Sequence, residues 1–374
     1  MTAHYTGLIN RYRDRLPVST NTPVISLNEG NTPLIELVNL PKKIKRNVRI
    51  LAKFEGLNPT GSFKDRGMTM AVSKAVEAGA RAIICASTGN TSAAAAAYAA
   101  RAGIACFVLI PEGKIALGKL SQAMMHGSVV IQIRGNFDDG MRLVQEVART
   151  LPLNIVNSIN PYRLQGQKTI AFEIVEALGE CPDYHFLPVG NAGNISAHWI
   201  GYSEAVGLKT ESSPNLDVAV PYKTGGLATK RPIMVGYQAS GAAPFLRGAM
   251  VDQPETVATA IRIGHPVSWK LAWAAKNESG GWFNECSDEE ILRAQKLLAD
   301  TEGIFCEPAS AISIAGLLKD LERSVIGEGS TIVCTLTGHG LKDPDTAIAQ
   351  SSKPFLVDAT RAAIETVIGA NLPT

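Results

Sequence analysis

Short apolar runs alternate with helical patterns along most of this 374-residue chain. The runs that are typical of buried strands are 82–86, 105–110, 128–133, 184–189 and 332–336. The helical patterns are 68–77, 91–102, 137–150 and 195–206. Strands that alternate with helices predict an α/β fold in which mostly parallel sheets are flanked by helices.

One predicted helix has an unusual composition. Seven of the eight residues 93–100 are alanine, which predicts a helix whose small side chains allow close packing on a sheet. Arg101 and Gly103 interrupt the apolar stretch 93–109, so no run is long enough to cross a membrane. The segment 208–231 contains two prolines and a Gly-Gly pair and is predicted to be irregular.

Composition narrows the classes of function. The chain is long enough for two domains, and its net charge of +2 is too small to indicate binding to nucleic acid or to an anionic membrane. The first 17 residues lack a signal-peptide core, so we expect a cytoplasmic protein. Six cysteines without C-x-x-C spacing predict buried free thiols, and six scattered histidines predict no metal site.

Lys64 is the first candidate for chemistry. It follows the turn-forming residues Asn58 to Gly61 and precedes a helical pattern. A lysine held in a cleft with a lowered pKa is the side chain that forms Schiff bases with carbonyl cofactors. The ordinary alternative is a solvated lysine in the first turn of a helix, since most lysines are exposed.

Three loops follow predicted strands, at the sheet edge where ligands bind in open parallel sheets. Residues 87–92 open a helix and are suited to a carboxylate, although Thr91 or Ser92 could simply cap that helix. Residues 190–194 are glycine-rich and suited to a phosphate, without matching either familiar nucleotide motif. In residues 337–340 the hydroxyl of Thr337 could donate to a heterocyclic nitrogen, and the alternative is a glycine turn capped by this threonine. With Lys64, the three loops suit pyridoxal 5′-phosphate.

Five motifs in the same order carry a family resemblance. They are Gly30–Leu34, Ser62–Arg66, Ser87–Asn90, Gly190–Asn194 and Thr337–Lys342. This order resembles the fold-type II pyridoxal-phosphate enzymes, which are similar to the tryptophan synthase β subunit. Residues 58–67, 307–310 and 336–344 resemble threonine synthases of the shorter bacterial type, and the likeness spans about 30–344.

The resemblance implies a role for each cofactor residue. Lys64 would form the Schiff base and later move protons, and Phe63 would flank the ring. Asn90 would bond the 3-oxygen of the ring, and Thr337 would face its nitrogen. The cradle for the phosphate would consist of Gly190, Asn191, Ala192, Gly193 and Asn194.

The implied substrate is O-phospho-L-homoserine. Its carboxylate would bind Ser87, Thr88 and Thr91, together with Asn90. Its phosphate would bind Asn157 and Arg163, with Lys114 as a further candidate.

The implied reaction is γ-elimination of phosphate and β-hydration, which gives L-threonine. Within the same family, β-elimination or β-replacement is the alternative, as in threonine or serine ammonia-lyases or a cysteate-synthase-like enzyme. A catalytically silent binding protein is the alternative from another class. We expect two open twisted sheets, a small mobile domain of residues 56–157 within a large domain of 1–55 and 158–374, and a homodimer.

Overall fold

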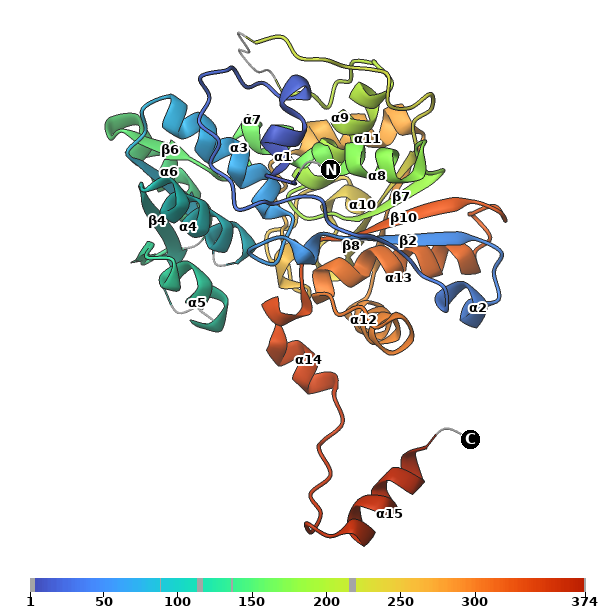
Figure 1. Cartoon of the computed structure of the whole chain (residues 1–374). Coiled ribbons are helices and arrows are strands. Elements are labelled where there is room, and N and C mark those ends of the chain that lie inside the picture. The colour runs from blue at the N-terminus through green and yellow to red at the C-terminus, as the bar shows by residue number, and fades with distance from the viewer. Residues whose placement is uncertain (1–3, 88, 113–116, 136, 215–219, 373–374) are drawn as a thin grey trace.

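The computed structural model describes residues 4–372 except 88, 113–116, 136 and 215–219. Its strands form two sheets flanked by helices, and a C-terminal helix stands away from both (Figure 1). The predicted α/β class with two mostly parallel sheets is confirmed. In the described part of the chain, no helix has the length and apolar character needed to cross a bilayer.

The larger sheet has six strands in the order β1-β2-β10-β7-β8-β9. Only β1 is antiparallel to its neighbour. The strand bounds are β1 Leu34–Glu36, β2 Arg49–Phe54, β7 Tyr184–Pro188, β8 Ile233–Ala239, β9 Trp282–Cys286 and β10 Thr331–Leu336. Because β10 lies between β2 and β7, the loops after these strands meet at one edge of the sheet.

The smaller sheet has four parallel strands in the order β5-β4-β3-β6. Their bounds are β3 Ala82–Ala86, β4 Ala105–Pro111, β5 Val129–Ile133 and β6 Leu153–Ile155. The loop after β3 begins with Ser87, and that after β6 leads through Asn157 to α7.

Helices cover the sheets and connect their strands. The α-helices are α1 Leu8–Arg11, α2 Leu40–Ile44, α3 Lys64–Glu77, α4 Asn90–Ala102, α5 Leu117–Met125, α6 Phe137–Thr150, α7 Pro161–Gln167, α8 Thr169–Leu178, α9 Gly193–Ala205, α10 Pro244–Arg247, α11 Trp269–Ser279, α12 Asp288–Glu302, α13 Pro308–Glu322, α14 Pro344–Gln350 and α15 Arg361–Asn371. The 3-10 helices are η1 Arg13–Arg15, η2 Glu55–Leu57, η3 Ser240–Ala242, η4 Thr259–Ile261 and η5 Gly340–Lys342.

The alanine-rich helix packs as predicted. Residues 93–99 of α4 are buried, in one hydrophobic core with β3 and β4. The segment between α9 and β8 forms no helix or strand in its described residues, which confirms the predicted irregular connection. All six cysteines are free and buried.

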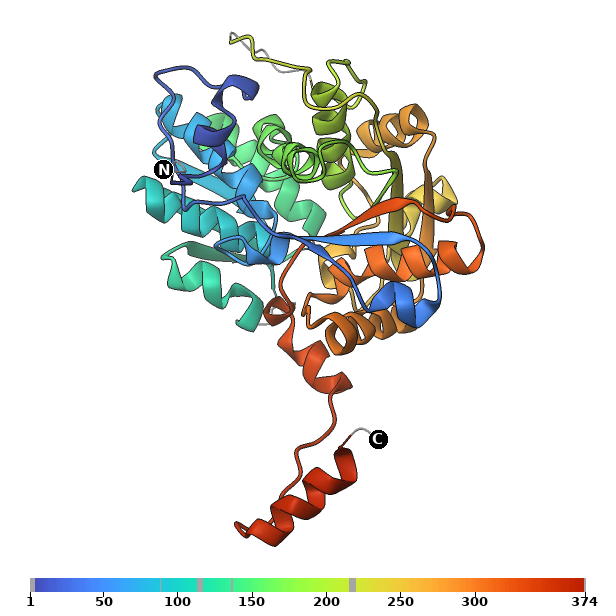
Figure 2. The same ribbon diagram turned by 45° about the vertical axis from the view of Figure 1, so that its right-hand side comes forward.

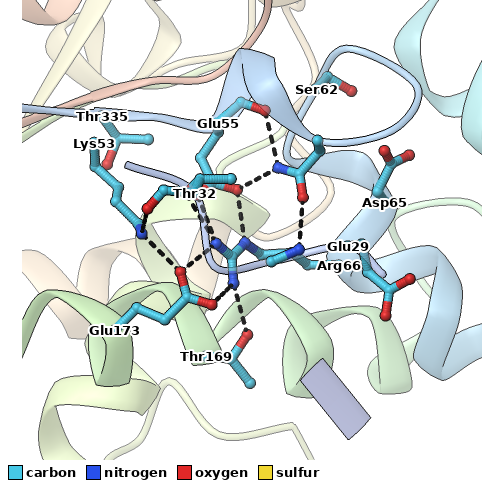
Figure 3. Close-up of polar contacts among 12 residues, drawn as sticks. Glu29, Thr32, Lys53, Glu55, Ser62, Asp65, Arg66, Thr169, Glu173 and Thr335 are labelled. Carbon is cyan, nitrogen blue, oxygen red and sulfur yellow. Dashed lines mark hydrogen bonds and ion pairs between the residues drawn. The ribbon is translucent and has the colours of Figure 1, made fainter. Parts of the chain in front are cut away.

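A buried cluster of charges ties α3 to the larger sheet (Figure 3). Arg66 forms ion pairs with Glu55 and Glu173, both at 2.7 Å, and Glu173 also contacts Lys53 at 2.6 Å. Thr32 adds hydrogen bonds to Lys53, Glu55 and Arg66. Two cations face two carboxylates, so the cluster has no net charge despite its burial. Arg66 lies two residues after Lys64, and the cluster therefore fixes the helix that carries the candidate lysine.

Candidate active site

Lys64 is the first residue of α3 and is partly buried. Its Nζ lies 4.2 Å from the centroid of the Phe63 ring, and no hydrogen-bond acceptor contacts it among the described residues. Burial, together with the positive charge of Arg163, lowers the pKa of Lys64 to about 7. Glu307 acts in the opposite direction. At neutral pH a large share of this amine is uncharged and nucleophilic, which a solvated lysine is not.

The loop before Lys64 is attached to the loop after β10. Phe63 donates its amide to the carbonyl of Thr337 at 3.0 Å, and His339 donates its amide to Gly61 at 2.9 Å. Asp65 also accepts hydrogen bonds from the amide and the hydroxyl of Thr60, so the turn is closed from both sides. Two of the predicted site segments, 62–66 and 337–340, therefore lie in direct contact.

Ser310 holds the hydroxyl of Thr337. The two side-chain oxygens lie 2.9 Å apart in a buried position near the start of α13. Ser310 Oγ also accepts the amide of Gly338 at 2.8 Å. Thr337 is thus an oriented hydroxyl at the carboxyl end of a strand, as the ring-nitrogen role requires.

Asn90 bridges the two halves of the site. It begins α4, and its Nδ2 donates to the Glu307 carboxylate at 3.0 Å and 3.3 Å. Glu307 precedes α13, is 5% exposed, and accepts no other side-chain donor among the described residues. Burial raises the pKa of Glu307. A Cβ at Gly338 would overlap this carboxylate, so Gly338 must be glycine for Glu307 to lie there.

Three helices begin at the site without a side-chain cap. They are α3, α4 and α9, with Phe63, Gly89 and Ala192 in the cap positions. Side-chain caps are present at α7, α12 and α15, through Asn160, Ser287 and Thr360, whereas α8, α11 and α13 also lack one. Thr91 and Ser92 do not cap α4, so the ordinary explanation for the 87–92 loop is wrong. At α3 the amides of Lys64 and Asp65 are bonded to Ser62, and that of Arg66 to Phe63. The uncapped starts of α4 and α9 leave backbone N–H groups for an anionic ligand.

The 190–194 loop has the backbone of an anion site. Ala192 adopts φ 65°, a left-handed conformation that is rare for a residue with a side chain and is often found at functional sites. The Oδ1 and Nδ2 atoms of Asn194 are buried without a partner. Asn191 fixes the loop, because its backbone oxygen accepts the amide of Ser268 at 3.1 Å. A Cβ at Gly190 would lie only 3.0 Å from the Cα of Ile261, so glycine suits this position.

A chain of hydrogen bonds links this loop to β10. His198 Nδ1 contacts the Asn194 carbonyl, Thr335 Oγ1 lies 3.4 Å from His198 Nε2, and His185 Nε2 lies 2.7 Å from the same hydroxyl. Tyr202 completes the chain at His185 Nδ1. Burial lowers the pKa of both histidines, that of His198 to about 4.

Arg163 lies against the helix of Lys64. Gly67 and Gly166 let α3 and α7 approach, since a Cβ at either would overlap the other helix. Arg163 donates to the carbonyl of Val156 at 3.2 Å, its Nε has no partner, and burial lowers its pKa to about 10. A buried guanidinium with an unpaired N–H, such as that of Arg163, is suited to bind an anionic group of a substrate.

The remaining predicted residues differ in their surroundings. Asn157 exchanges two hydrogen bonds with the backbone of Ala86, at 2.9 Å and 3.0 Å, and so supports the loop after β3. Ser87 accepts the amide of Gly89, and Thr91 lies partly buried in the first turn of α4. Thr88 and Lys114 lie outside the described residues.

Sequence reasoning assigned no role to Glu307, Ser310 or His198. Their partners Asn90, Thr337 and Asn194 were predicted, but no spacing rule joins residues as distant as Asn90 and Glu307. The available signal was the stretch 307–310, which contributed only to the resemblance.

Together these groups fit a cofactor with an aldehyde, a phosphate and a ring nitrogen. Lys64 supplies an amine that can be uncharged, the start of α9 supplies free amides and the unpartnered Asn194, and Thr337 supplies a hydroxyl.

Comparison with known proteins agrees with this chemistry. Residues 25–338 match the family model described as "Pyridoxal-phosphate dependent enzyme". A threonine synthase of Synechocystis is 56% identical over 345 residues, 92% of this chain and 85% of that protein. Threonine synthases of Mycobacterium tuberculosis and Methanocaldococcus jannaschii are 56% and 48% identical, over 94% and 96% of this chain and 93% and 86% of theirs.

Solved structures show the same fold at low identity. Maize serine racemase has a TM-score of 0.70 at 19% identity, with 88% of this chain and 94% of that chain covered. Threonine deaminase isoform 2 of Solanum lycopersicum has a TM-score of 0.67 at 20% identity, with 83% and 80% covered. Similarity at this level supports the fold and leaves the reaction to the site.

Proposed function

The chain belongs to the pyridoxal-phosphate dependent enzymes, and we propose that it acts as a threonine synthase, which converts O-phospho-L-homoserine and water to L-threonine and phosphate. The observation that carries this proposal is a lysine with a pKa of about 7 beside a buried arginine whose Nε has no partner. Lys64 would bind a carbonyl cofactor, and Arg163 would bind a substrate that carries its own phosphate.

The cofactor is pyridoxal 5′-phosphate, which supplies an electron-withdrawing ring that stabilises a carbanion at the substrate Cα. Lys64 would hold its aldehyde carbon, and the amides of 190–194 with Asn194 would hold its phosphate. The side chain of Asn90 would give up its hydrogen bond to Glu307 and donate instead to the 3-oxygen of the cofactor ring. The hydroxyl of Thr337, oriented by Ser310, would meet the ring nitrogen without adding a charge.

Lys64 Nζ would remove the Cα proton of the substrate and return a proton later. Its lowered pKa suits both directions, because a general base works best when its pKa lies near the working pH. Arg163 would bind the substrate phosphate and stabilise its charge as it leaves. The uncapped start of α4, with Ser87, Thr91 and Thr88, would orient the substrate carboxylate.

The assay is phosphate and threonine formation from O-phosphohomoserine by the purified protein. Stoichiometric phosphate and L-threonine are expected. A ketoacid formed from threonine or serine as the main product would instead assign β-elimination, and absence of a Schiff-base absorbance after cofactor addition would indicate a silent homologue.

Three further expectations belong to the same proposal. Residues 56–157 include all four strands of the smaller sheet, and we expect them to close over the substrate as a mobile unit that excludes water. We also expect a homodimer and a cytoplasmic location. Limited proteolysis with and without substrate analogue, and light scattering, test the first two of these.

A further inference from the structure

We propose that residues 352–372 form an exchanged arm that packs on a second copy of the same chain. This C-terminal arm consists of an extended segment, 352–360, and helix α15. This inference rests on the proposed homodimer and is independent of the proposed reaction.

The C-terminal arm stands apart from its own protomer. It leaves the body after α14 and points away from both sheets in two views (Figures 1 and 2). The hydrogen bonds of its described residues are all local, such as the Thr360 cap and the Arg361–Glu365 pair. In the part of the chain described, no hydrogen bond or ion pair joins 352–372 to the remainder; the last connection is Gln350 to Gln295 at 2.7 Å.

The arm nevertheless has the composition of a buried element. Leu356 is 99% exposed, beside the exposed Phe355. Helix α15 places Ile364, Val367 and Ile368 at spacings of three and four residues, which form one apolar face. A helix of 11 residues is marginal in water without a surface to pack on. The sequence therefore encodes a capped, amphipathic helix whose apolar face requires a partner surface.

A complementary surface lies where the arm leaves the body. We call it the base patch, and its residues are Met124, Met125, Leu341 and Ile348. Met125 is 85% exposed, Leu341 70% and Ile348 71%. The end of α5 is joined to η5 by a hydrogen bond of 2.6 Å from Lys342 to Gln122, so these residues form one region.

The chemistry favours a second copy as the occupant. The arm contains two cations and two carboxylates, and this neutral charge gives no attraction to an anionic membrane. The C-terminal arm and the base patch occur on the same chain. In a dimer with a twofold axis, each arm can therefore pack on the base patch of the other protomer. The nine extended residues can span about 30 Å, enough to cross such an axis. The 21 residues of each arm match the roughly 20–30 residues that a standard interface takes from each side.

A photo-crosslinking experiment tests the exchange directly. The full-length holoenzyme carries benzoylphenylalanine in place of Leu356, and isotopically light and heavy preparations are mixed before irradiation. We expect light-to-heavy crosslinks from the arm to peptides that contain 122–125 or 341–348. Crosslinks confined within one chain, or none to these peptides, would overturn the proposal.

A matched set of variants gives the second measurement. The triple variant Leu356→Asp, Ile364→Asp and Ile368→Asp alters only side chains that are exposed in the protomer, so each protomer should still fold. Sedimentation should show a dimer for the unaltered protein and a dissociation constant raised at least about 100-fold for the variant. The control Leu208→Asp changes an exposed leucine elsewhere and should leave the dimer intact.

Each outcome bears on one proposal at a time. A monomeric unaltered protein, a dimer unaffected by the triple variant, or binding of the arm to anionic vesicles by a monomer would each overturn the exchanged arm. Phosphate release from O-phosphohomoserine by such a protein would still support the proposed reaction. Conversely, a dimer with exchanged arms that releases no phosphate would overturn the reaction alone.

Discussion

The imidazole Nδ1 of His198 lies 2.8 Å from the carbonyl oxygen of Asn194. A carbonyl can only accept, so Nδ1 carries the proton and the neutral ring leaves Nε2 as an acceptor. The Thr335 hydroxyl then donates to His198 Nε2 and accepts from His185 Nε2. The donor-to-acceptor direction of this series of hydrogen bonds thus follows from one carbonyl, in the first turn of α9, where we propose that the cofactor phosphate binds.

His198→Leu should weaken cofactor binding, because it separates the start of α9 from β10. We expect a fall in affinity of about 5- to 20-fold, the size of one or two buried hydrogen bonds. His198→Asn keeps a donor near Nδ1 and should recover part of the loss. Titration of the cofactor-free protein measures the affinity, and the phosphorus resonance of bound cofactor reports the cradle.

The exposed His126 supplies the control, since His126→Ala should change neither measurement. If His198→Leu lowers thermal stability but leaves affinity and the phosphorus resonance unchanged, His198 has no positioning role.

Lys64 should set the pH dependence of cofactor capture. With a pKa lowered to about 7, its uncharged fraction increases through pH 7 and is nearly complete well below the ordinary value of 10.5. The rate of Schiff-base formation by cofactor-free protein should rise to about pH 8 and then level off. Stopped-flow absorbance measures it, and a rate that keeps rising to pH 10 contradicts the lowered pKa. Lys64→Ala should show no Schiff-base band, whereas Lys74→Ala, on the same helix, should behave normally.

Arg163→Ala should impair use of the phosphorylated substrate while the cofactor stays bound. Loss of a charged hydrogen-bond donor predicts a rise in KM for O-phosphohomoserine of about 10- to 100-fold. Because Arg163 lowers the pKa of Lys64, the variant should also shift the pH profile of Schiff-base formation upward. Arg142→Ala, an exposed arginine on α6, is the control. An unchanged KM would remove Arg163 from the phosphate site.

Ser310→Ala should disturb Thr337 without touching the cofactor itself. Thr337 would lose its side-chain partner and Gly338 an amide acceptor, so we expect kcat to fall about tenfold and the cofactor absorbance to shift. Ser313→Ala, one turn further along α13, removes a similarly buried hydroxyl and should leave the spectrum unchanged. Equal destabilisation of both variants without a spectral difference would reduce Ser310 to a structural residue.

Glu173→Gln should destabilise the fold by about 3–5 kcal/mol, because it leaves Lys53 and Arg66 underpaired in a buried site. Glu176→Gln, one turn along the same helix, breaks the exposed pair with Arg11 and should cost at most about 1 kcal/mol. Urea unfolding measures both. Equal losses for the two variants would contradict the difference in burial.

The same cluster predicts an acid response. The neighbouring Arg66 and Lys53 outweigh burial and lower the pKa of Glu173 to about 2. A lowered carboxyl pKa contributes stability above the unfolded value of about 4.5, and that contribution is lost as pH falls toward 2. Unfolding free energy should therefore fall less steeply between pH 4.5 and 2 in Glu173→Gln than in the unaltered protein.

Sequence patterns located β3, β4, β5, β7 and β10 within a residue or two, because continuous apolar runs end at turn residues there. They did not identify β1, β2, β6, β8 or β9. In β8, Gly236 interrupts the apolar run. A Cβ at Gly236 would overlap Phe283 and Val189, so this glycine reflects packing from other strands rather than a break. The contact from Asn90 to Glu307 likewise forms only once two sheets are assembled, and no local pattern encodes it.

The missing caps on α4 and α9 would make native stability depend on bound cofactor. First-turn N–H groups that Asn160, Ser287 and Thr360 satisfy in α7, α12 and α15 would here be bonded by the cofactor. Native stability should then increase with the logarithm of free cofactor concentration, as for any ligand that binds only the folded state. In a cell short of vitamin B6, less enzyme would persist, independently of how fast each molecule turns over.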